Sequence, residues 1–171
     1  MTLDNTALSV AVAATLNNAT LDLGVIATAP LLLTTSLGMS TGTGAGQADK
    51  IFADTRTIAA SSNDDLDLNG VLVDALGATI NFLRVKALIV RASATNANTL
   101  IMGGGASNPV TTILGGTTPT LTIRPGGVLA LIATEATAYV ITPATADILR
   151  FTNGGAGSSV TYDVVIIGAS A

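Results

Sequence analysis

The segment VTYDVVII, residues 160–167, decides the fold class of this chain. Four apolar side chains share one of its faces, at Val160, Tyr162, Val164 and Ile166. The other face begins with Thr161 and Asp163 and turns apolar toward Ile167. An alternation with a period of two residues is typical of a β-strand that is buried on one face. The change along the segment predicts that one end of the strand is buried on both faces.

The same period recurs through the rest of the chain after residue 48. In TLTIR, residues 120–124, Leu121 and Ile123 share one face. The longest candidate is TINFLRVKALIVRA, residues 79–92, with Leu83, Val85, Ala87 and Ile89 on one face and Arg84 and Lys86 on the other. Further strands are expected at residues 50–59, 99–102, 110–114, 128–133, 139–141 and 148–152. Residues 71–78 are compatible with a helical turn or with a short strand.

Short strands at this spacing, separated by Gly, Pro and Asn turns and without a helical stripe between them, predict an all-β fold. We expect a two-sheet antiparallel sandwich, jelly-roll-like, with an N-terminal extension. A closed barrel is the alternative. The apolar core is expected to include Leu83, Val85, Ile89, Leu121, Ile123, Tyr162 and Val164.

Composition removes several classes of function. The 171 residues include no Cys and no His, so the chain offers no disulfide, no thiolate ligand and no imidazole for zinc or for proton transfer. The net charge of -4 disfavours nucleic acid as a partner, because a phosphate backbone requires clustered Lys and Arg. Only 11% of the residues are charged, whereas 49% are hydrophobic. This balance predicts that apolar surface is buried between subunits as well as within one.

Residues 1–48 differ from the rest of the chain, since Asp4 and Asp22 are their only charged residues. They end in the Gly-rich run STGTGAGQ, residues 40–47, which predicts a flexible hinge. We expect an N-terminal extension or arm over residues 1–48 and one β-sandwich domain over residues 49–171.

The apolar runs of this extension predict neither a secretion signal nor a membrane span. No Lys or Arg precedes ALSVAVAATL, residues 7–16, as the start of a signal peptide requires. The run VIATAPLLLTTSLG, residues 25–38, is too short to cross a bilayer and is interrupted by Pro30. We therefore expect no membrane partner.

The segment SSNDDLDLNG, residues 61–70, matches the first half of an EF-hand calcium loop through side chains at Asp65, Asp67 and Asn69. The position that requires a bidentate Glu is Leu76, and no amphipathic helices flank the segment. The alternative is a strand whose leucines point inward and which ends in an Asn69-Gly70 turn. We expect the strand and turn, and no metal site.

Catalytic patterns are incomplete. Asp54-Thr55-Arg56 begins like an aspartic protease motif, but Arg replaces the Gly and a second copy is missing. The run GTGAG, residues 42–46, lacks the later residues of a dinucleotide or phosphate loop. Glu135 could form a glycosidase pair with Asp147 or Asp163, but the sequence sets no distance between them. We expect no enzyme, no catalytic residue and no cofactor.

Three of the seven cations lie within eight residues, at Arg84, Lys86 and Arg91. They could form a basic strand face that docks on an acidic partner. A solvated or salt-bridged face, balanced by the acids of residues 49–74, is the more common arrangement and the one we expect.

Three segments, RVKALIVRAS, TIRPGGVLALIA and ADILRFTNGGAGSSVTYDVVIIGAS, resemble small structural proteins of tailed bacteriophages. The shared features are the RPGG turn, a strand that ends in an Asn-Gly-Gly loop, and the closing TYDVVIIGAS strand. The resemblance covers residues 49–171 and includes no catalytic motif and no residue-by-residue role. It implies a β-sandwich subunit of the virion, of the head decoration or cement type, which typically sits as a trimer on the outside of the capsid.

The resemblance and the composition lead to one functional expectation. The chain is expected to be a homotrimeric cement protein that binds the major capsid protein on the outer surface of the head and stabilises the lattice. Candidate assembly contacts are Leu31, Leu32, Leu33, Arg84 and Lys86. The three leucines are expected to pack on a neighbouring subunit or on the capsid, with an ordinary first strand of the subunit's own core as the alternative. A tail-tip or receptor-binding module, whose loops at residues 103–108 and 153–159 contact a host glycan, is the functional alternative.

Overall fold

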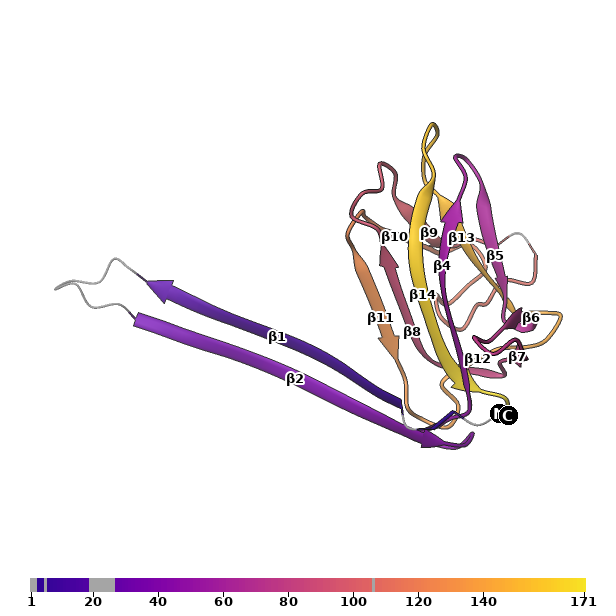
Figure 1. The fold of residues 1–171 in the computed structure, drawn as a ribbon, viewed down its shortest axis with the longest axis horizontal. Coiled ribbons are helices and arrows are strands. Elements are labelled where there is room, and N and C mark those ends of the chain that lie inside the picture. The colour runs from indigo at the N-terminus through magenta and orange to yellow at the C-terminus, as the bar shows by residue number, and fades with distance from the viewer. Residues whose placement is uncertain (1–2, 5, 19–26, 106) are drawn as a thin grey trace.

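The computed structural model describes residues 3–4, 6–18, 27–105 and 107–171, and this part of the chain folds into β-strands without any α-helix (Figure 1). The strands are β1 (Thr6–Asn18), β2 (Ala27–Thr41), β3 (Gln47–Ala48), β4 (Lys50–Ile58), β5 (Asn63–Asp67), β6 (Asn69–Val73), β7 (Thr79–Asn81), β8 (Arg84–Ala92), β9 (Leu100–Gly103), β10 (Thr120–Ile123), β11 (Val128–Ile132), β12 (Tyr139–Val140), β13 (Ile148–Asn153) and β14 (Val160–Ala169).

Two antiparallel sheets pack face to face to form a sandwich (Figure 1). The five-stranded sheet has the order β11-β8-β14-β4, and β12 also pairs with β8. The four-stranded sheet has the order β10-β9-β13-β5. When the eight strands of these two orders are numbered along the chain, one sheet reads 6-3-8-1 and the other reads 5-4-7-2. This is the strand order of a jelly roll. The prediction of an all-β two-sheet sandwich is confirmed.

The main core lies between the two sheets and contains the inward side chains of both. Its largest fully buried members include Tyr162, Phe82 and Phe151. The ring centroids of Phe151 and Tyr162, on opposite sheets, lie 4.7 Å apart. Four of the predicted core residues are buried here, namely Val85, Ile123, Tyr162 and Val164.

Three predicted core residues lie elsewhere. Leu121 is 37% exposed, Leu83 is half-buried, and Ile89 packs on the outer face of the five-stranded sheet. The reason for Ile89 is a register shift, because Ile167 pairs with Ala87 whereas Gly168 pairs with Val85. A β-bulge of this kind inserts one residue, Lys86 here, and moves every later side chain to the other face.

One short segment differs from the sequence prediction, and the structure assigns a second segment that the sequence leaves open. The sequence predicts a strand at residues 110–114, but these residues form a turn in which the Gly115 N–H donates to the Thr111 carbonyl at 2.7 Å. Residues 71–78, compatible with strand or helix, continue β6 and then turn at Asp74, whose carboxylate accepts hydrogen bonds from the N–H groups of Leu76 and Ala78.

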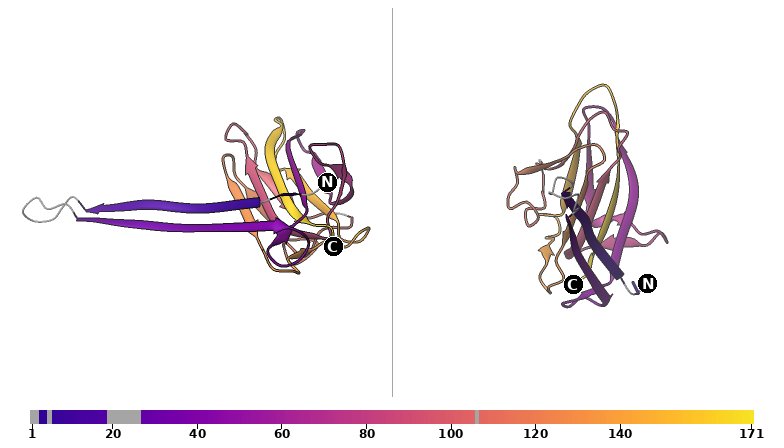
Figure 2. Two further views of the ribbon diagram at one scale, coloured as in Figure 1. Left: turned by 60° about the horizontal axis from the view of Figure 1, so that its bottom comes forward. Right: turned by 90° about the vertical axis from the view of Figure 1, so that its left-hand side faces the viewer.

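Strands β1 and β2 form an antiparallel hairpin that extends away from the sandwich (Figures 1 and 2). We call these two strands the arm. The views from two further directions agree that only the end of the arm near Thr6 and Thr41 meets the sandwich, where β2 pairs in parallel with β3.

Candidate functional site

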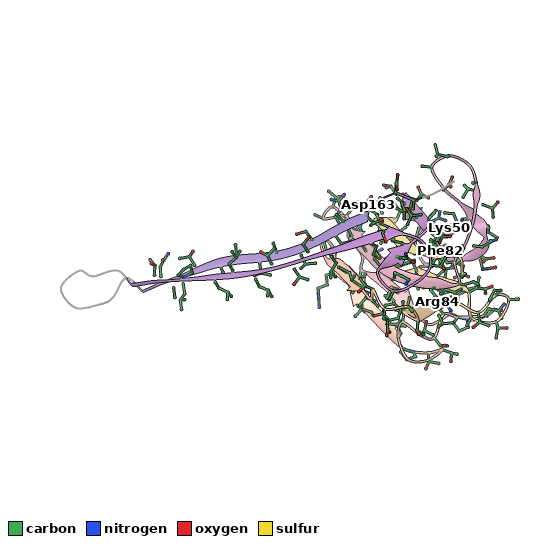
Figure 3. The ribbon with its side chains drawn as sticks, turned by 90° about the horizontal axis from the view of Figure 1, so that it is seen from below. Lys50, Phe82, Arg84 and Asp163 are labelled. Atoms are coloured by element: carbon green, nitrogen blue, oxygen red, sulfur yellow. The ribbon has the colours of Figure 1, made fainter. Side chains whose placement is uncertain are left out.

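The arm is a long uncharged ribbon. Its strands pair continuously from Thr6 with Met39 to Asn18 with Ala27, and neither strand contains a charged residue. At about 3.3 Å per residue, the 13 residues of β1 span roughly 40 Å. The distal part of the arm therefore reaches beyond its own sandwich, and Figure 3 shows its side chains standing clear of that body.

The two faces of the arm differ in chemistry. Residues that pair directly across an antiparallel ladder point to the same face, and successive residues alternate. Among the side chains that the structure describes, one face carries nine aliphatic ones, which we call the apolar stripe: Leu8, Val10, Val12, Ala14, Leu16, Ala29, Leu31, Leu33 and Leu37. The opposite face is mostly Ser, Thr and Ala, with Leu32 as its one large aliphatic side chain among the described residues.

The three predicted leucines are exposed and do not share one face. Leu31 and Leu33 belong to the apolar stripe and are 60% and 61% exposed, whereas Leu32 points to the opposite face and is 74% exposed. None of them lies in the core of its own subunit, so the interpretation as an ordinary core strand is wrong. Their packing on a partner stays a prediction.

The end of the arm near Thr6 and Thr41, which we call the root, packs on the outer face of the five-stranded sheet. Met39, which shares the face of the apolar stripe, is buried in a cluster with Ala48, Ala87 and Ile167, and Leu8 packs against this cluster. Ile167 is therefore covered on the outer face although it lies on β14, a strand whose opposite face is in the main core. This contact explains why one end of β14 is buried on both faces, as its sequence predicts.

Lys86 binds the loop at the root of the arm through hydrogen bonds from inside the subunit. Its side chain is fully buried, and its ammonium donates to the carbonyl oxygen of Gly44 at 2.6 Å and to that of Glu135 at 2.9 Å. Burial lowers the pKa of Lys86 below that of a free lysine, and the charge of Arg84 acts in the same direction. The sequence interpretation places Lys86 on a solvated or salt-bridged strand face. This expectation is wrong, because the bulge turns its side chain under the root of the arm.

The Gly-rich run at residues 40–47 is a compact loop. The Ser40 N–H donates to the Gly46 carbonyl at 3.0 Å, and the Gly46 N–H donates to the Thr134 carbonyl at 2.7 Å. The Gln47 side-chain oxygen accepts the Gly44 N–H at 2.9 Å. The sequence predicts a flexible hinge here, whereas the structure has a loop bonded to itself and to the sandwich, so the direction of the arm is set by these contacts.

Next to the root, the outer face of the five-stranded sheet has a shallow groove with a volume of about 700 Å³, which we call the outer groove. Its lining residues come from four strands: Ala53, Asp54, Thr55, Ile89, Arg91, Val128, Asp163, Val164 and Val165. Val128, at one side, is 63% exposed. The charged lining groups are paired, since Arg91 contacts Asp163 at 2.5 Å and Asp54 contacts Arg56 at 3.0 Å.

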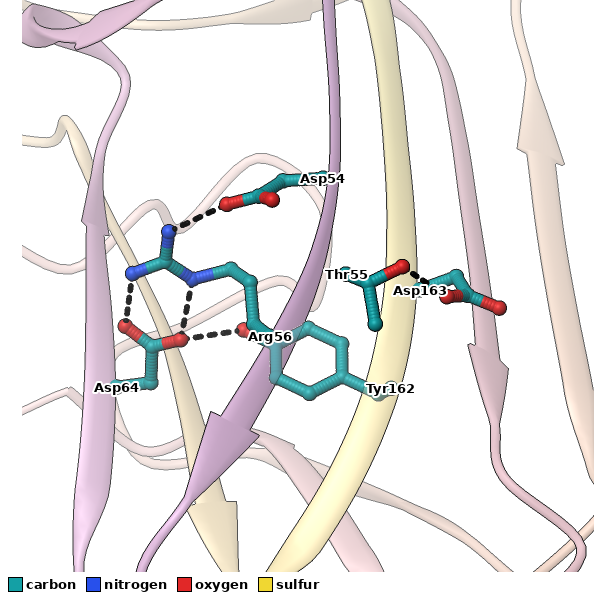
Figure 4. A network of polar contacts seen from close by, with 6 residues as sticks. All are labelled: Asp54, Thr55, Arg56, Asp64, Tyr162 and Asp163. Atoms are coloured by element: carbon teal, nitrogen blue, oxygen red, sulfur yellow. Dashed lines mark hydrogen bonds and ion pairs between the residues drawn. The ribbon is translucent and has the colours of Figure 1, made fainter.

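A second polar cluster joins the two sheets at the β4 edge (Figure 4). The Asp64 carboxylate accepts two hydrogen bonds from the Arg56 guanidinium, at 2.5 and 2.8 Å, and one from the Tyr162 hydroxyl at 2.8 Å. Every member has a partner within the cluster, so this arrangement stabilises the sandwich and offers no free acid, base or nucleophile.

The pKa shifts in this cluster follow from its geometry. Burial acts to raise the pKa of Asp64, but the hydrogen bonds from Arg56 and Tyr162 outweigh it and the pKa lies below its ordinary value. Burial and the negative charge of Asp64 raise the pKa of Tyr162. The hydrogen bond to Asp64 raises the pKa of Arg56. All three groups therefore keep their usual charge states through the physiological range.

The partial calcium motif forms strand β5 with its leucines inward, as predicted, but the turn falls at Leu68, because Asn69 and Gly70 already belong to β6. Leu66 and Leu68 are fully buried. The Asp65 carboxylate accepts both of its hydrogen bonds from Arg150 at 2.6 Å, and Asp67 accepts the N–H of Asn69 at 2.9 Å. These carboxylates have partners within the sandwich. Among the described residues, no group of three His, Cys, Asp or Glu side chains is placed to hold a metal ion.

Two of the remaining catalytic candidates, Asp147 and Asp163, have structural partners. Asp147 is buried and accepts the N–H of Ala144 at 2.5 Å, whereas Asp163 bonds to Arg91 and to the Thr55 hydroxyl. Asp163 has a lowered pKa because Thr55 and Arg91 donate hydrogen bonds to it. These carboxylates act as a turn cap and an ion-pair partner, and Glu135 is exposed.

The three cations of strand β8 lie in different environments. Arg91 lies on the outer face and pairs with Asp163, Lys86 is buried at the root, and Arg84 is half-buried beside the bulge (Figure 3). The partner of Arg91 is thus an acid of β14 and not one of the acids at residues 49–74. Arg84 as an assembly contact stays a prediction.

The apolar stripe and the outer groove could not be predicted from the sequence. The alternation of Leu8, Val10 and Val12 is a strand signal for the apolar stripe, but its pairing partner on β2 cannot be read without the register. The outer groove has no signal in the sequence, because its residues are spread over four strands.

No helix in the described part of the chain has the length and apolar character that crossing a membrane requires. A scan against protein-family models finds none that matches the chain, and a search of the curated proteins also finds no match.

Proposed function

We propose that the chain is a structural protein of a tailed-phage virion, of the head decoration or cement type. As a homotrimer it binds the major capsid protein on the outer surface of the head and stabilises the lattice. The phage assignment is supported by the sequence resemblance of residues 49–171, and the assembly role is supported by the arm.

The exposed apolar stripe is the observation that carries an assembly role. A two-stranded hairpin has no core of its own and is marginally stable in water. The arm nevertheless exposes large side chains along most of its length, such as Leu16, which is 75% exposed. Burying one leucine stabilises a protein by about 1.5–3 kcal/mol, so a surface of this kind is expected to be covered in the working assembly.

The sandwich provides weaker support. Jelly rolls form viral capsid domains, but they also form lectins and cupins, and a fold alone does not establish function. The ion-paired carboxylates described above favour a structural role over a catalytic one.

Counting copies in the particle tests the proposal. The experiment is quantitative mass spectrometry of purified virions of the phage that encodes the chain, with its major capsid protein as the internal standard. A copy number of the same order as that of the capsid protein is expected for a lattice-binding subunit. A handful of copies would instead support the tail-tip or receptor-binding module, and a chain missing from the virion would contradict both.

A further inference from the structure

We propose that the distal part of the apolar stripe binds the outer groove of a second copy of this chain. The proposal concerns how copies associate, and it does not depend on where in a virion, or in any other assembly, the protein works.

The first argument is continuity between the groove and an existing contact. Ile89 and Val165 line the outer groove, and both also pack against the root cluster that contains Met39. Leu8, the first member of the apolar stripe, packs against that same cluster. One part of this sheet face is therefore already covered by side chains of the stripe, and the groove is the adjoining part that is not.

The second argument is reach. The strands of the arm leave the sandwich at its root, and their distal residues lie far from the body (Figures 1 and 2). The Gly-rich loop at residues 40–47, which is hydrogen-bonded to Lys86 and to Thr134, sets this direction. The arm of one subunit therefore does not fill the groove of the same subunit, and the matching surface has to come from another molecule.

The third argument is chemical complementarity. The apolar stripe has no charge, and the charged side chains that line the groove have partners: Arg91 pairs with Asp163, and Asp54 pairs with Arg56, which also binds Asp64. Beside the Arg91–Asp163 pair, Ile89, Val165 and Ala53 form an aliphatic row across three strands, and Val128 lies on the other side of Arg91. An uncharged, aliphatic ribbon fits such a surface, whereas a phosphate or an acidic peptide requires an unpaired cation.

Contact between the arm of one copy and the groove of the next is heterologous. Such contacts close into a ring when the rotation between neighbours permits it. In a ring every arm and every groove is occupied, and three copies would give the trimer proposed above.

Cysteine crosslinking in the full-length chain tests this arrangement directly, because the chain has no Cys of its own. Ala14 belongs to the apolar stripe, its neighbour Ala13 points to the opposite face, and Ala53 lines the outer groove; all three are exposed. The double variants A14C/A53C and A13C/A53C are treated with a short thiol-specific crosslinker and separated on a denaturing gel. The single variants A14C and A53C are the controls, and circular dichroism checks that each variant keeps the β-rich spectrum of the parent.

We expect A14C/A53C to form covalent dimers and trimers several-fold more efficiently than A13C/A53C, with little product from either single variant. Efficient crosslinking of A14C alone would mean that arms pack on arms and would overturn the proposal. Efficient crosslinking of A53C alone would mean that grooves face one another, with the same consequence. Equal yields from the two double variants, or no intermolecular product from either, would also overturn it.

Discussion

The ammonium of Lys86 lies 2.6 Å from the carbonyl oxygen of Gly44, and this hydrogen bond joins the sandwich to the loop from which the arm emerges. Lys86 occupies the bulge that shifts the register between β8 and β14. A single irregularity in the sheet thus places a buried cation under the root of the arm and turns the later residues of β8 toward the outer groove.

Replacing Lys86 tests this anchor. In K86M the carbonyl oxygens of Gly44 and Glu135 lose their buried donor, and we expect the free energy of unfolding to fall by about 1–3 kcal/mol. Urea denaturation measures the change. K50M is the matched control, because Lys50 is only half-buried, and it should change the stability by less than about 0.5 kcal/mol. Equal effects of the two variants would mean that Lys86 is not an anchor.

The Arg56–Asp64–Tyr162 cluster predicts a pH dependence. The pKa of Asp64 is lower in the folded chain than its ordinary value of 3.8, so the unfolded chain binds the proton first as the pH falls. The stability that the carboxylate contributes is complete at neutral pH and is lost as the pH falls through its folded pKa.

In D64N this contribution is missing at every pH. We expect the variant to be less stable than the parent by about 1–3 kcal/mol at pH 7, and the difference to shrink toward acid pH. Denaturation curves at neutral and acid pH measure it. D65N is the control and breaks the ion pair of Asp65 with Arg150. Because Asp65 is more exposed than Asp64, the free energy of unfolding should fall by at most about 1 kcal/mol at neutral pH. A difference between D64N and the parent that grows toward acid pH would refute the assigned role of Asp64.

Gly168 is required where the register shifts. A Cβ atom at this position would collide with the carbonyl oxygen of Arg84 and would lie 2.8 Å from the ring of Phe82. We expect G168A to lower the free energy of unfolding by about 1–3 kcal/mol. In the control G38A the nearest atom to the new Cβ is the Thr6 carbonyl oxygen at 3.8 Å, so little change is expected. A fully stable G168A protein would show that the bulge tolerates a side chain.

Shortening the arm separates its role from that of the sandwich. Ser9 and Ser36 are direct partners, so residues 10–35 can be replaced by a two-residue Asn-Gly turn that closes the hairpin beyond the root. Leu8, Met39 and the Gly44 carbonyl stay in place. We expect a folded β-rich protein that is a monomer by light scattering. An unfolded product would show that the sandwich needs the distal arm for its own stability.

Much of the sandwich can be predicted from the sequence, because its strands are short and alternate with a period of two. The segment at residues 160–167 becomes β14, and its predicted change from one-sided to two-sided burial is found where the root covers Ile167. Two predicted turns separate strands: Pro125-Gly126-Gly127 lies between β10 and β11, and Gly154-Gly155 lies between β13 and β14, whereas Asn69-Gly70 lies within β6.

The errors have local physical causes. The bulge at Lys86 changes which residues of β8 face the core, and no residue type marks a bulge in advance. Residues 110–114 are rich in β-branched side chains, but the bond from Gly115 back to Thr111 closes them into a turn. The candidate site was only partly predictable. The sequence predicts that Leu31, Leu32 and Leu33 are contact residues because they are apolar, but which of them share a face depends on the pairing with β1.

The mass of the protein in solution tests the central claim, that the apolar stripe joins copies of the chain. Light scattering is measured for the parent, for L31T/L33T on the apolar stripe and for L32T on the opposite face. We predict a closed oligomer, a trimer by the proposal above, for the parent and for L32T. L31T/L33T is predicted to be a monomer with an unchanged circular dichroism spectrum, because these side chains are exposed within their own subunit. A monomeric parent, or an L31T/L33T variant that keeps the mass of the parent, would contradict the account.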